Sequence, residues 1–160
     1  MPSKKVFGAD NQQERLRFIG WIMGFVDGEG CFTVSFFKHP KSRLRLKWQV
    51  FPEFVITQGM KTKNAVKKVK KYFGCGEIYL NRRHDNHHEH LIKYVVRNRE
   101  DLLEKIIPFF EKYQLLSAKK KDFQVFARIV RMMKKKEHLK GKGLGKIRLM
   151  VRAMNNRKFR

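Results

Sequence analysis

Two acidic residues, Asp27 and Glu29, alternate with glycines in the segment Gly-Phe-Val-Asp-Gly-Glu-Gly at positions 24–30. The residues before this segment have helical spacing, and Gly28 and Gly30 are expected to end that helix. A helix C-terminus carries a partial negative charge, so a carboxylate placed there favours a bound cation. By spacing alone, the two acids are also consistent with ordinary helix-end residues.

The charge of the chain indicates the kind of partner. The 160 residues, the length of one domain, include 38 Lys and Arg against 14 Asp and Glu, a net charge of +24. A folded domain with this charge repels itself, so we expect a polyanionic partner, with DNA or RNA favoured over an anionic membrane surface. No apolar run approaches the roughly 20 residues that span a bilayer, and no signal peptide is recognised. We therefore expect an intracellular nucleic-acid-binding domain without membrane association.

Hydrophobic periodicity predicts the order helix, strand, strand, helix, strand, strand, helix, followed by C-terminal helices. The expected ranges are 14–26, 31–38, 44–58, 61–73, 77–82, 91–97, 99–113, 117–134 and 144–156, with residues 1–13 as an N-terminal tail. Pro52 is expected at a bulge or edge, and Pro108 is expected to bend its helix. This order predicts an α+β fold over residues 14–160, in which helices cover one face of a four-stranded antiparallel sheet and leave a polar, basic face open. No internal repeat is found, so the chain carries one copy of this unit.

The first predicted helix has glycines where helices normally avoid them. Gly20 and Gly24 lie four residues apart and therefore stack on one stripe. Glycine inside a helix costs about 1 kcal/mol relative to alanine, a cost that is explained if a second backbone approaches closely there. Because apolar residues occur on nearly all sides of this helix, we expect it to be buried nearly all round.

The segment 21–30, Trp-Ile-Met-Gly-Phe-Val-Asp-Gly-Glu-Gly, resembles the LAGLIDADG motif of homing endonucleases, with Glu29 in the place of the final acid. The order of elements, Thr57-Gln58 at the end of the second strand, the lysine-rich helix start near 119 and the tail 143–156 are also similar to that family. The resemblance covers essentially the whole chain after residue 13.

The resemblance implies a site-specific double-strand DNA endonuclease of the intron-homing type that hydrolyses phosphodiester bonds. Glu29 would bind Mg²⁺ or another divalent cation, helped by the Gly28 carbonyl. Gln58 would hold the attacking water, and Lys119 would stabilise charge that develops on the phosphate. The second acid, Asp27, tends to be structural in this family, and no small-molecule cofactor is expected.

One motif per chain implies a homodimer, because single-motif members of this family pair their motif helices. The expected interface consists of Gly20, Trp21, Met23 and Gly24, and its two-fold symmetry predicts a long pseudo-palindromic DNA target. Trp21 and Met23 stand where the motif usually has Leu and Ala, so the helix pair must fit two bulky side chains.

The resemblance also places the open sheet face in the DNA major groove, where base pairs can be distinguished. The expected DNA contacts are Thr33, Ser35, Lys47, Gln49, Glu53, Tyr79, Asn81 and Lys93, with Lys61 and Lys63 as further candidates. The histidine-rich loop 83–90 is expected to face DNA rather than to hold a metal.

Two further possibilities remain on the same fold, an intron RNA maturase and a non-cleaving DNA-binding regulator. The cellular setting stays open between an organelle, either mitochondrion or chloroplast, and a prokaryotic cytoplasm.

Overall fold

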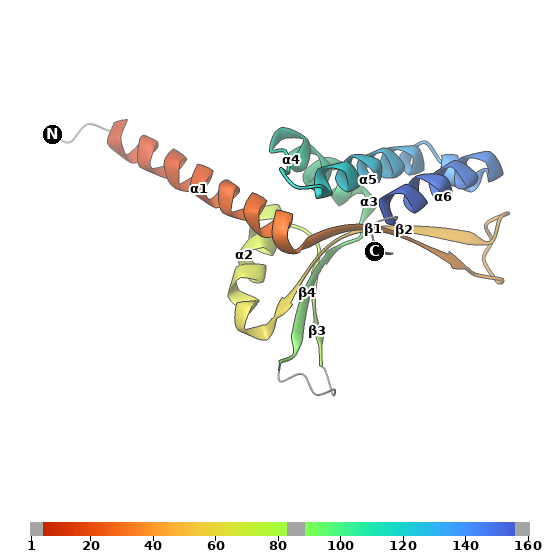
Figure 1. Ribbon diagram of the computed structural model, residues 1–160, viewed down its shortest axis with the longest axis horizontal. Helices are drawn as coiled ribbons and strands as arrows, with labels where there is room; N and C mark the ends of the chain where they lie inside the picture. The colour runs from red at the N-terminus through yellow and green to blue at the C-terminus, as the bar shows by residue number, and fades with distance from the viewer. Residues whose placement is uncertain (1–4, 83–88, 156–160) are drawn as a thin grey trace.

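The computed structural model describes residues 5–82 and 89–155 (Figure 1). Its strands are β1 (Gly30–Lys38), β2 (Trp48–Gly59), β3 (Glu77–Asn81) and β4 (Leu91–Val96). They form one sheet with the order β1-β2-β4-β3, and all neighbours are antiparallel. The predicted four-stranded antiparallel sheet is therefore confirmed.

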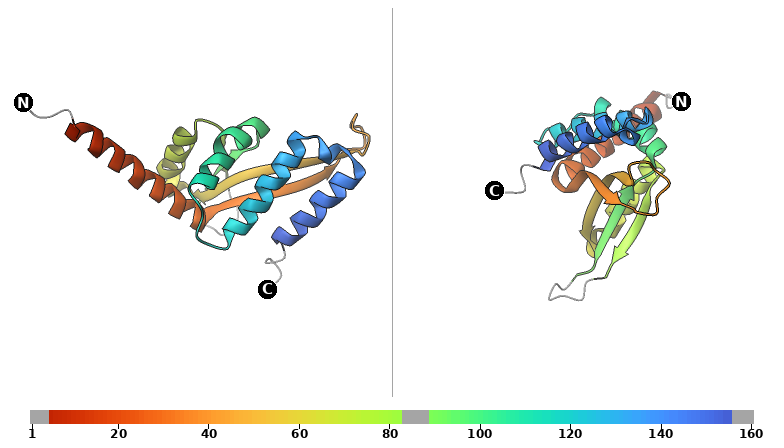
Figure 2. Two further views of the ribbon diagram at one scale, coloured as in Figure 1. Left: turned by 90° about the horizontal axis from the view of Figure 1, so that it is seen from above. Right: turned by 90° about the vertical axis from the view of Figure 1, so that its right-hand side faces the viewer.

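The helical elements pack on one side of this sheet, as Figure 2 shows from above. They are α1 (Lys5–Glu29), η1 (Met60–Thr62), α2 (Lys63–Phe73), α3 (Arg99–Asp101), η2 (Leu102–Ile106), α4 (Ile107–Lys112), α5 (Lys119–Lys134), η3 (Glu137–Leu139) and α6 (Gly141–Asn155). Within the described ranges, no helix is long and apolar enough to cross a membrane.

Phenylalanine rings fill the space between the sheet and the helices. Alternation along β1 and β2 turns Phe32 and Phe54 to the same side, where their ring centroids lie 5.1 Å apart. Phe32 also contacts Phe123 of α5 at 5.2 Å and Phe110 of α4 at 5.4 Å. Phe54 is completely buried. These contacts join the sheet to two helices and fix which sheet face remains open.

Helix α1 differs from the prediction at its start. It begins at Lys5 rather than at Glu14, so the segment predicted as a tail, 1–13, is helical from Lys5 onward. Residues 11–17 are exposed, and this part of α1 projects away from the rest of the molecule (Figure 1).

The expectation that α1 is buried nearly all round is wrong. Ile22 and Val26 are completely buried, whereas Leu16 and Trp21 are 55% and 39% exposed. The apolar residues around α1 thus exceed what this chain can cover, because the helix has neighbours on one side only among the described residues.

Strand β2 begins at Trp48 rather than at residue 44 because the preceding residues form a turn. Lys47 has a φ of 56°, in the left-handed region that breaks strand alternation. Its N–H donates to the Leu44 carbonyl at 3.0 Å and its ammonium to the Ser42 carbonyl at 2.5 Å. The prediction of Lys47 as an outward strand residue is therefore wrong.

Pro52 and Pro108 lie where the backbone does not need an N–H group. Pro52 pairs with Val34 of β1, on the part of β2 that extends beyond β4, in agreement with the expected edge position. Pro108 is the second residue of α4, one residue after the π-helical turn η2. A proline cannot donate to the carbonyl four residues earlier, and a wider turn accommodates its ring. The predicted helix over 99–113 is thus continuous but irregular before Pro108.

We expect Phe54→Ala to lower the free energy of unfolding by about 3–5 kcal/mol, since a fully buried ring leaves a cavity. Denaturant unfolding followed by circular dichroism measures this change. Phe37→Ala removes an equally large ring that is 58% exposed and should change stability by roughly 0.5 kcal/mol or less. Equal losses in both variants would contradict the assignment of the core side of the sheet.

Candidate active site

The C-terminal end of α1 passes directly into the sheet. The helix ends at Glu29 and β1 begins at Gly30, without a loop between them. A Cβ at position 30 would lie 2.6 Å from the Val26 side chain and 2.9 Å from the Val26 carbonyl oxygen. Glycine is therefore required at this junction, and the carboxylate of Glu29 is exposed directly beside it.

Asp27 fastens the α1 end to the segment before α5. Its carboxylate accepts hydrogen bonds from the Leu116 N–H at 2.8 Å and the Ser117 N–H at 3.2 Å, and from the Ser117 hydroxyl. Burial raises the pKa of Asp27, but these hydrogen bonds and the Lys119 charge lower it further than burial raises it. These contacts give Asp27 the structural role that the resemblance implies.

Lys119 binds the same helix end, although it lies 92 residues after Asp27 in the sequence. Its ammonium donates to the backbone carbonyls of Val26 and Asp27, each at 2.9 Å. Carbonyls at the end of a helix lack partners within the helix, and their partial negative charge favours a cation. Burial lowers the pKa of Lys119, while the nearby charges, Glu29 among them, oppose that shift.

The geometry distinguishes Lys119 from the lysines that follow it. Lys120 donates to the Gln114 side chain at 2.8 Å, and Lys121 is exposed. The prediction selected Lys119 through resemblance, and the structure brings this lysine next to the Glu29 end of α1.

Gln58 lies at the edge of the same junction. Ile56 of β2 pairs with Gly30 of β1, so Gln58 continues β2 two residues past the start of β1, beside the last turn of α1. Its side chain is half-buried and makes no hydrogen bond with any described residue. The structure thus brings Glu29 and Lys119 together beside the Gly28 backbone, and the register places the Gln58 backbone at the adjoining end of β2.

Lys61 lies in η1 and Lys63 is the first residue of α2, and both are exposed. No sequence pattern singles out Glu89, whose carboxylate accepts a hydrogen bond from the Lys61 N–H at 2.6 Å. A Cβ at Gly59 would collide with the Glu89 carboxylate. The Glu89 carboxylate thus lies directly over position 59.

The outward face of the sheet contains seven of the predicted DNA contacts. The strand registers turn to one side the residues Thr33, Ser35, Gln49, Glu53, Tyr79, Asn81 and Lys93. The face is less polar than predicted, because Val55 and Val95 lie at its centre and Phe37 packs edge-on against Phe51 with ring centroids 5.4 Å apart. The histidine-rich loop 83–90 was the other predicted DNA-facing segment, and its residues 83–88 lie outside the described residues.

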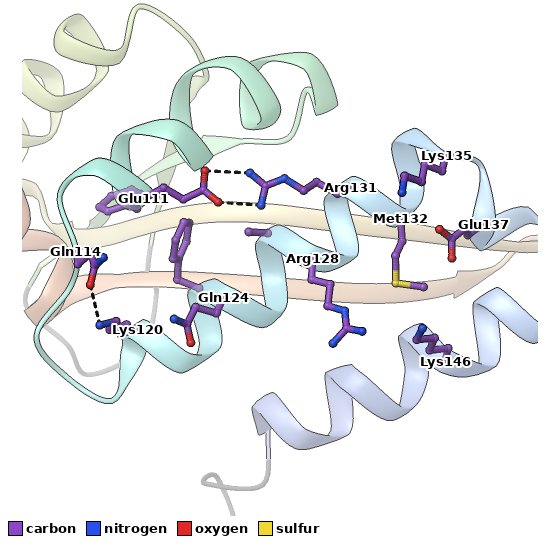
Figure 3. A pocket seen from close by; sticks show the side chains of 13 residues that line it. Glu111, Gln114, Lys120, Gln124, Arg128, Arg131, Met132, Lys135, Glu137 and Lys146 are labelled. Atoms are coloured by element: carbon purple, nitrogen blue, oxygen red, sulfur yellow. Dashed lines mark hydrogen bonds and ion pairs between the residues drawn. The ribbon is translucent and has the colours of Figure 1, made fainter.

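A cavity of about 550 Å³ lies elsewhere, between α4, α5 and α6 (Figure 3). Arg131 forms an ion pair with Glu111 at its rim, and Arg128 and Lys146 also line it. None of the junction residues contributes to this cavity. The candidate site is therefore an open surface at the end of α1, which suits a large substrate better than an enclosed small molecule.

The glycines of α1 form an exposed stripe on the side away from the core. Gly20, Gly24 and Gly28 are exposed, and a Cβ at any of them would meet nothing within 4 Å. Trp21 stacks between Phe18 and Phe25 along the flank of this stripe, at 5.4 Å and 5.1 Å. Met23, which is half-buried, packs against the core. The predicted interface residues thus divide into the open stripe and two side chains held by their own chain.

Comparison with known proteins agrees with this geometry. The family model described as LAGLIDADG endonuclease matches residues 22–130. The chain belongs to the LAGLIDADG endonuclease family.

Several relatives are similar over most of the chain. A probable intron-encoded endonuclease 3 of Neurospora crassa is 33% identical over 95% of this chain and 27% of its own length. Homing endonuclease I-ApeII of Aeropyrum pernix is 35% identical over 69% of this chain and 61% of its own length. The chain thus spans about a quarter of the first curated relatives that it matches.

Solved structures share the fold. The crystal structure of the homing endonuclease I-TnaI has a TM-score of 0.75 and 37% identity, covering 86% of this chain and 87% of that one. I-SmaMI bound to cleaved DNA has a TM-score of 0.77 and 30% identity, covering 86% of this chain and 44% of that one.

We expect Asp27→Asn to lower the free energy of unfolding at pH 7 by about 1–2 kcal/mol, because charged hydrogen bonds are weakened. The folded pKa of Asp27 lies below its ordinary value of 3.8. Its contribution is therefore present above that value and is lost as the pH falls through the folded pKa. Unfolding measured across this range should show the two proteins converge at low pH.

The matched control is Glu14→Gln, which neutralises an exposed acid on α1 and should leave stability unchanged. A deficit in Asp27→Asn that persists at every pH would assign the loss to packing rather than to the carboxylate charge.

Proposed function

We propose that the chain is a site-specific double-strand DNA endonuclease of the intron-homing type, acting as a homodimer on a long pseudo-palindromic target. The observation that carries this proposal is the junction where Lys119 binds the last carbonyls of α1 beside Glu29. This junction borders the outward sheet face, so a duplex lying on that face would bring a phosphate to it. A net charge of +24 favours such binding.

The junction fits a divalent cation in part. Glu29 offers hard carboxylate oxygens at the negative end of a helix, and the Gly28 carbonyl is a further oxygen donor. Among the described residues, no three His, Cys, Asp or Glu side chains group together as a metal site. We therefore assign the remaining ligands to DNA phosphates and to the second copy of the chain. Mg²⁺ bound there would activate water and stabilise the leaving oxygen.

The residues of the chain divide the remaining work. Gln58, half-buried at the junction and without a described partner, would orient the attacking water through its amide. Lys119 would stabilise negative charge as it develops on the scissile phosphate. The two carbonyls that it binds limit the motion of its ammonium, so little reorganisation is needed during the reaction.

The glycine stripe supports the homodimer. Gly20 and Gly24, inside the helix, each cost about 1 kcal/mol relative to alanine. Apart from the backbone of α1 itself, no atom of the described residues lies within 4 Å of a Cβ added at either position. A second α1 packed against the stripe would give them a function, since glycine lets two helix backbones come close. This chain covers 44% of I-SmaMI but 87% of I-TnaI. A single I-SmaMI chain thus has room for two such units, which this protein would supply as two copies.

Relatives named as intron-encoded in fungi and a homing endonuclease from Aeropyrum pernix support the homing role. We place the protein inside the cell, in an organelle or in a prokaryotic cytoplasm.

We expect Glu29→Gln to bind its target normally but to cut at least about 100-fold more slowly, because a metal ligand is lost. Cleavage of plasmids carrying the DNA that flanks the gene measures this, with Glu14→Gln as the control that keeps full activity. Chelation of divalent cations should stop the wild type. Full cleavage by Glu29→Gln would reject the assigned role. Selective binding of intron RNA without any DNA nicking by the wild type would favour a maturase.

We expect Gly24→Leu to abolish dimerisation and DNA cleavage while leaving the monomer folded. Position 24 is exposed and a Cβ there meets nothing within 4 Å in the described part of the chain. Leucine also improves helix propensity, but it would separate two helices that meet there. The control is Gly145→Leu in α6, which is likewise exposed and open. Sedimentation velocity should give a monomer for the first variant and a dimer for the control. A dimer in both would exclude the stripe as the interface.

A further inference from the structure

An arginine that the sequence did not single out lies on the outward sheet face. The last β2–β4 pair is Phe54 with Val96, so the next positions bring Glu53 opposite Arg97. Arg97 has the same parity as Lys93 and therefore faces outward with it. It is exposed, and it follows the last residue of β4 directly.

Two neighbouring strands restrain the Arg97 side chain. Its Nε donates to a carboxylate oxygen of Glu53, in an ion pair where Glu53 is 17% exposed and Arg97 51% exposed. Its guanidinium carbon lies 5.4 Å from the ring centre of Tyr79 on β3, a cation–π distance. An arginine at a sheet surface normally samples many rotamers, and these two contacts reduce that freedom.

The ion pair with Glu53 occupies only the Nε edge of the Arg97 guanidinium. The ion pair engages Nε, and among the described residues no acceptor is recorded for the two terminal nitrogens. Guanine presents two acceptors, O6 and N7, side by side in the major groove, and a guanidinium fork matches them in a bidentate pair. A phosphate would accept the same donors without distinguishing bases.

We propose that Arg97 reads a guanine in each half of the DNA target and that Glu53 is its positioning residue rather than a base reader. The inference rests on the proposed DNA-binding function of this face. It assigns a specificity-determining residue outside the junction and changes the role expected for Glu53. Held by its neighbour, the acid also no longer presents an unpaired negative charge to DNA.

The experiment is selection of bound duplexes from a randomised library, without a divalent cation, so that binding is scored separately from cutting. We compare wild type with Arg97→Lys, which keeps the charge but loses the fork, and with Glu53→Gln, which keeps the shape but loses the charge. Arg131→Lys is the matched control, because Arg131 is also ion-paired to a glutamate, Glu111, but lies at the helix-side cavity (Figure 3). Thermal unfolding checks that each variant is folded.

Wild type should select guanine at one position per half-site. Arg97→Lys should lose that preference on the order of tenfold, Glu53→Gln should weaken it at the same position, and Arg131→Lys should preserve it. A wild-type consensus that Arg97→Lys leaves unchanged would overturn the proposal. So would a uniform loss of affinity over all sequences, which marks a phosphate contact.

The selection also separates this inference from the endonuclease. One outcome is that guanine selection depends on Arg97 but the protein cuts no selected duplex when Mg²⁺ is added. This would support Arg97 as a base-reading residue and reject the proposed endonuclease activity. A wild type that enriches no duplex at all would overturn both.

Discussion

The fixed geometry at the end of α1 is the constraint on which the rest of the structure depends. A helix that continues into a strand without a loop has free carbonyls at its last turn. No loop residues are present there to donate hydrogen bonds to these carbonyls. Lys119 satisfies two of them with its ammonium, and Asp27 in return binds the amides of the segment that leads to α5. These reciprocal contacts lock the direction in which Glu29 leaves the helix.

The fixed direction of the chain at Glu29 determines two surfaces, the outward sheet face and the glycine stripe of α1. Because β1 starts at Gly30, its odd-numbered residues face away from the helices, and the registers of β2, β4 and β3 extend this face across the sheet. The opposite side of α1 is left with exposed glycines that no other described segment covers. Catalysis, DNA reading and pairing of two copies are therefore proposed for surfaces that share one helix end, and a shift of that end would disturb all three.

The sequence predicts the features that depend on local spacing and leaves out those that depend on contacts between distant segments. The strand alternation that faces Thr33 and Ser35 outward is local, and the sequence predicts it correctly.

The placement of Lys47 in a strand is wrong because its left-handed backbone is set by turn hydrogen bonds, not by alternation. The predicted burial of α1 is too high because its apolar pattern includes a surface that residues 5–82 and 89–155 leave exposed. The Glu53–Arg97 pair joins residues 44 positions apart, and no local pattern encodes that register. Gln58 and Lys119 were found only through resemblance, since a strand-end amide and one lysine among three carry no signal of their own.

The central claim is that two chains pair, that each chain has one junction, and that each junction cuts one DNA strand. The most direct measurement mixes wild type with Lys119→Met, allows the subunits to exchange, and follows a supercoiled plasmid that carries the target. Mixed dimers hold one intact junction, so the account predicts a stable nicked circle, in addition to linear DNA from wild-type dimers. Linear DNA alone, falling in proportion to the wild-type fraction and without a nicked product, would contradict it.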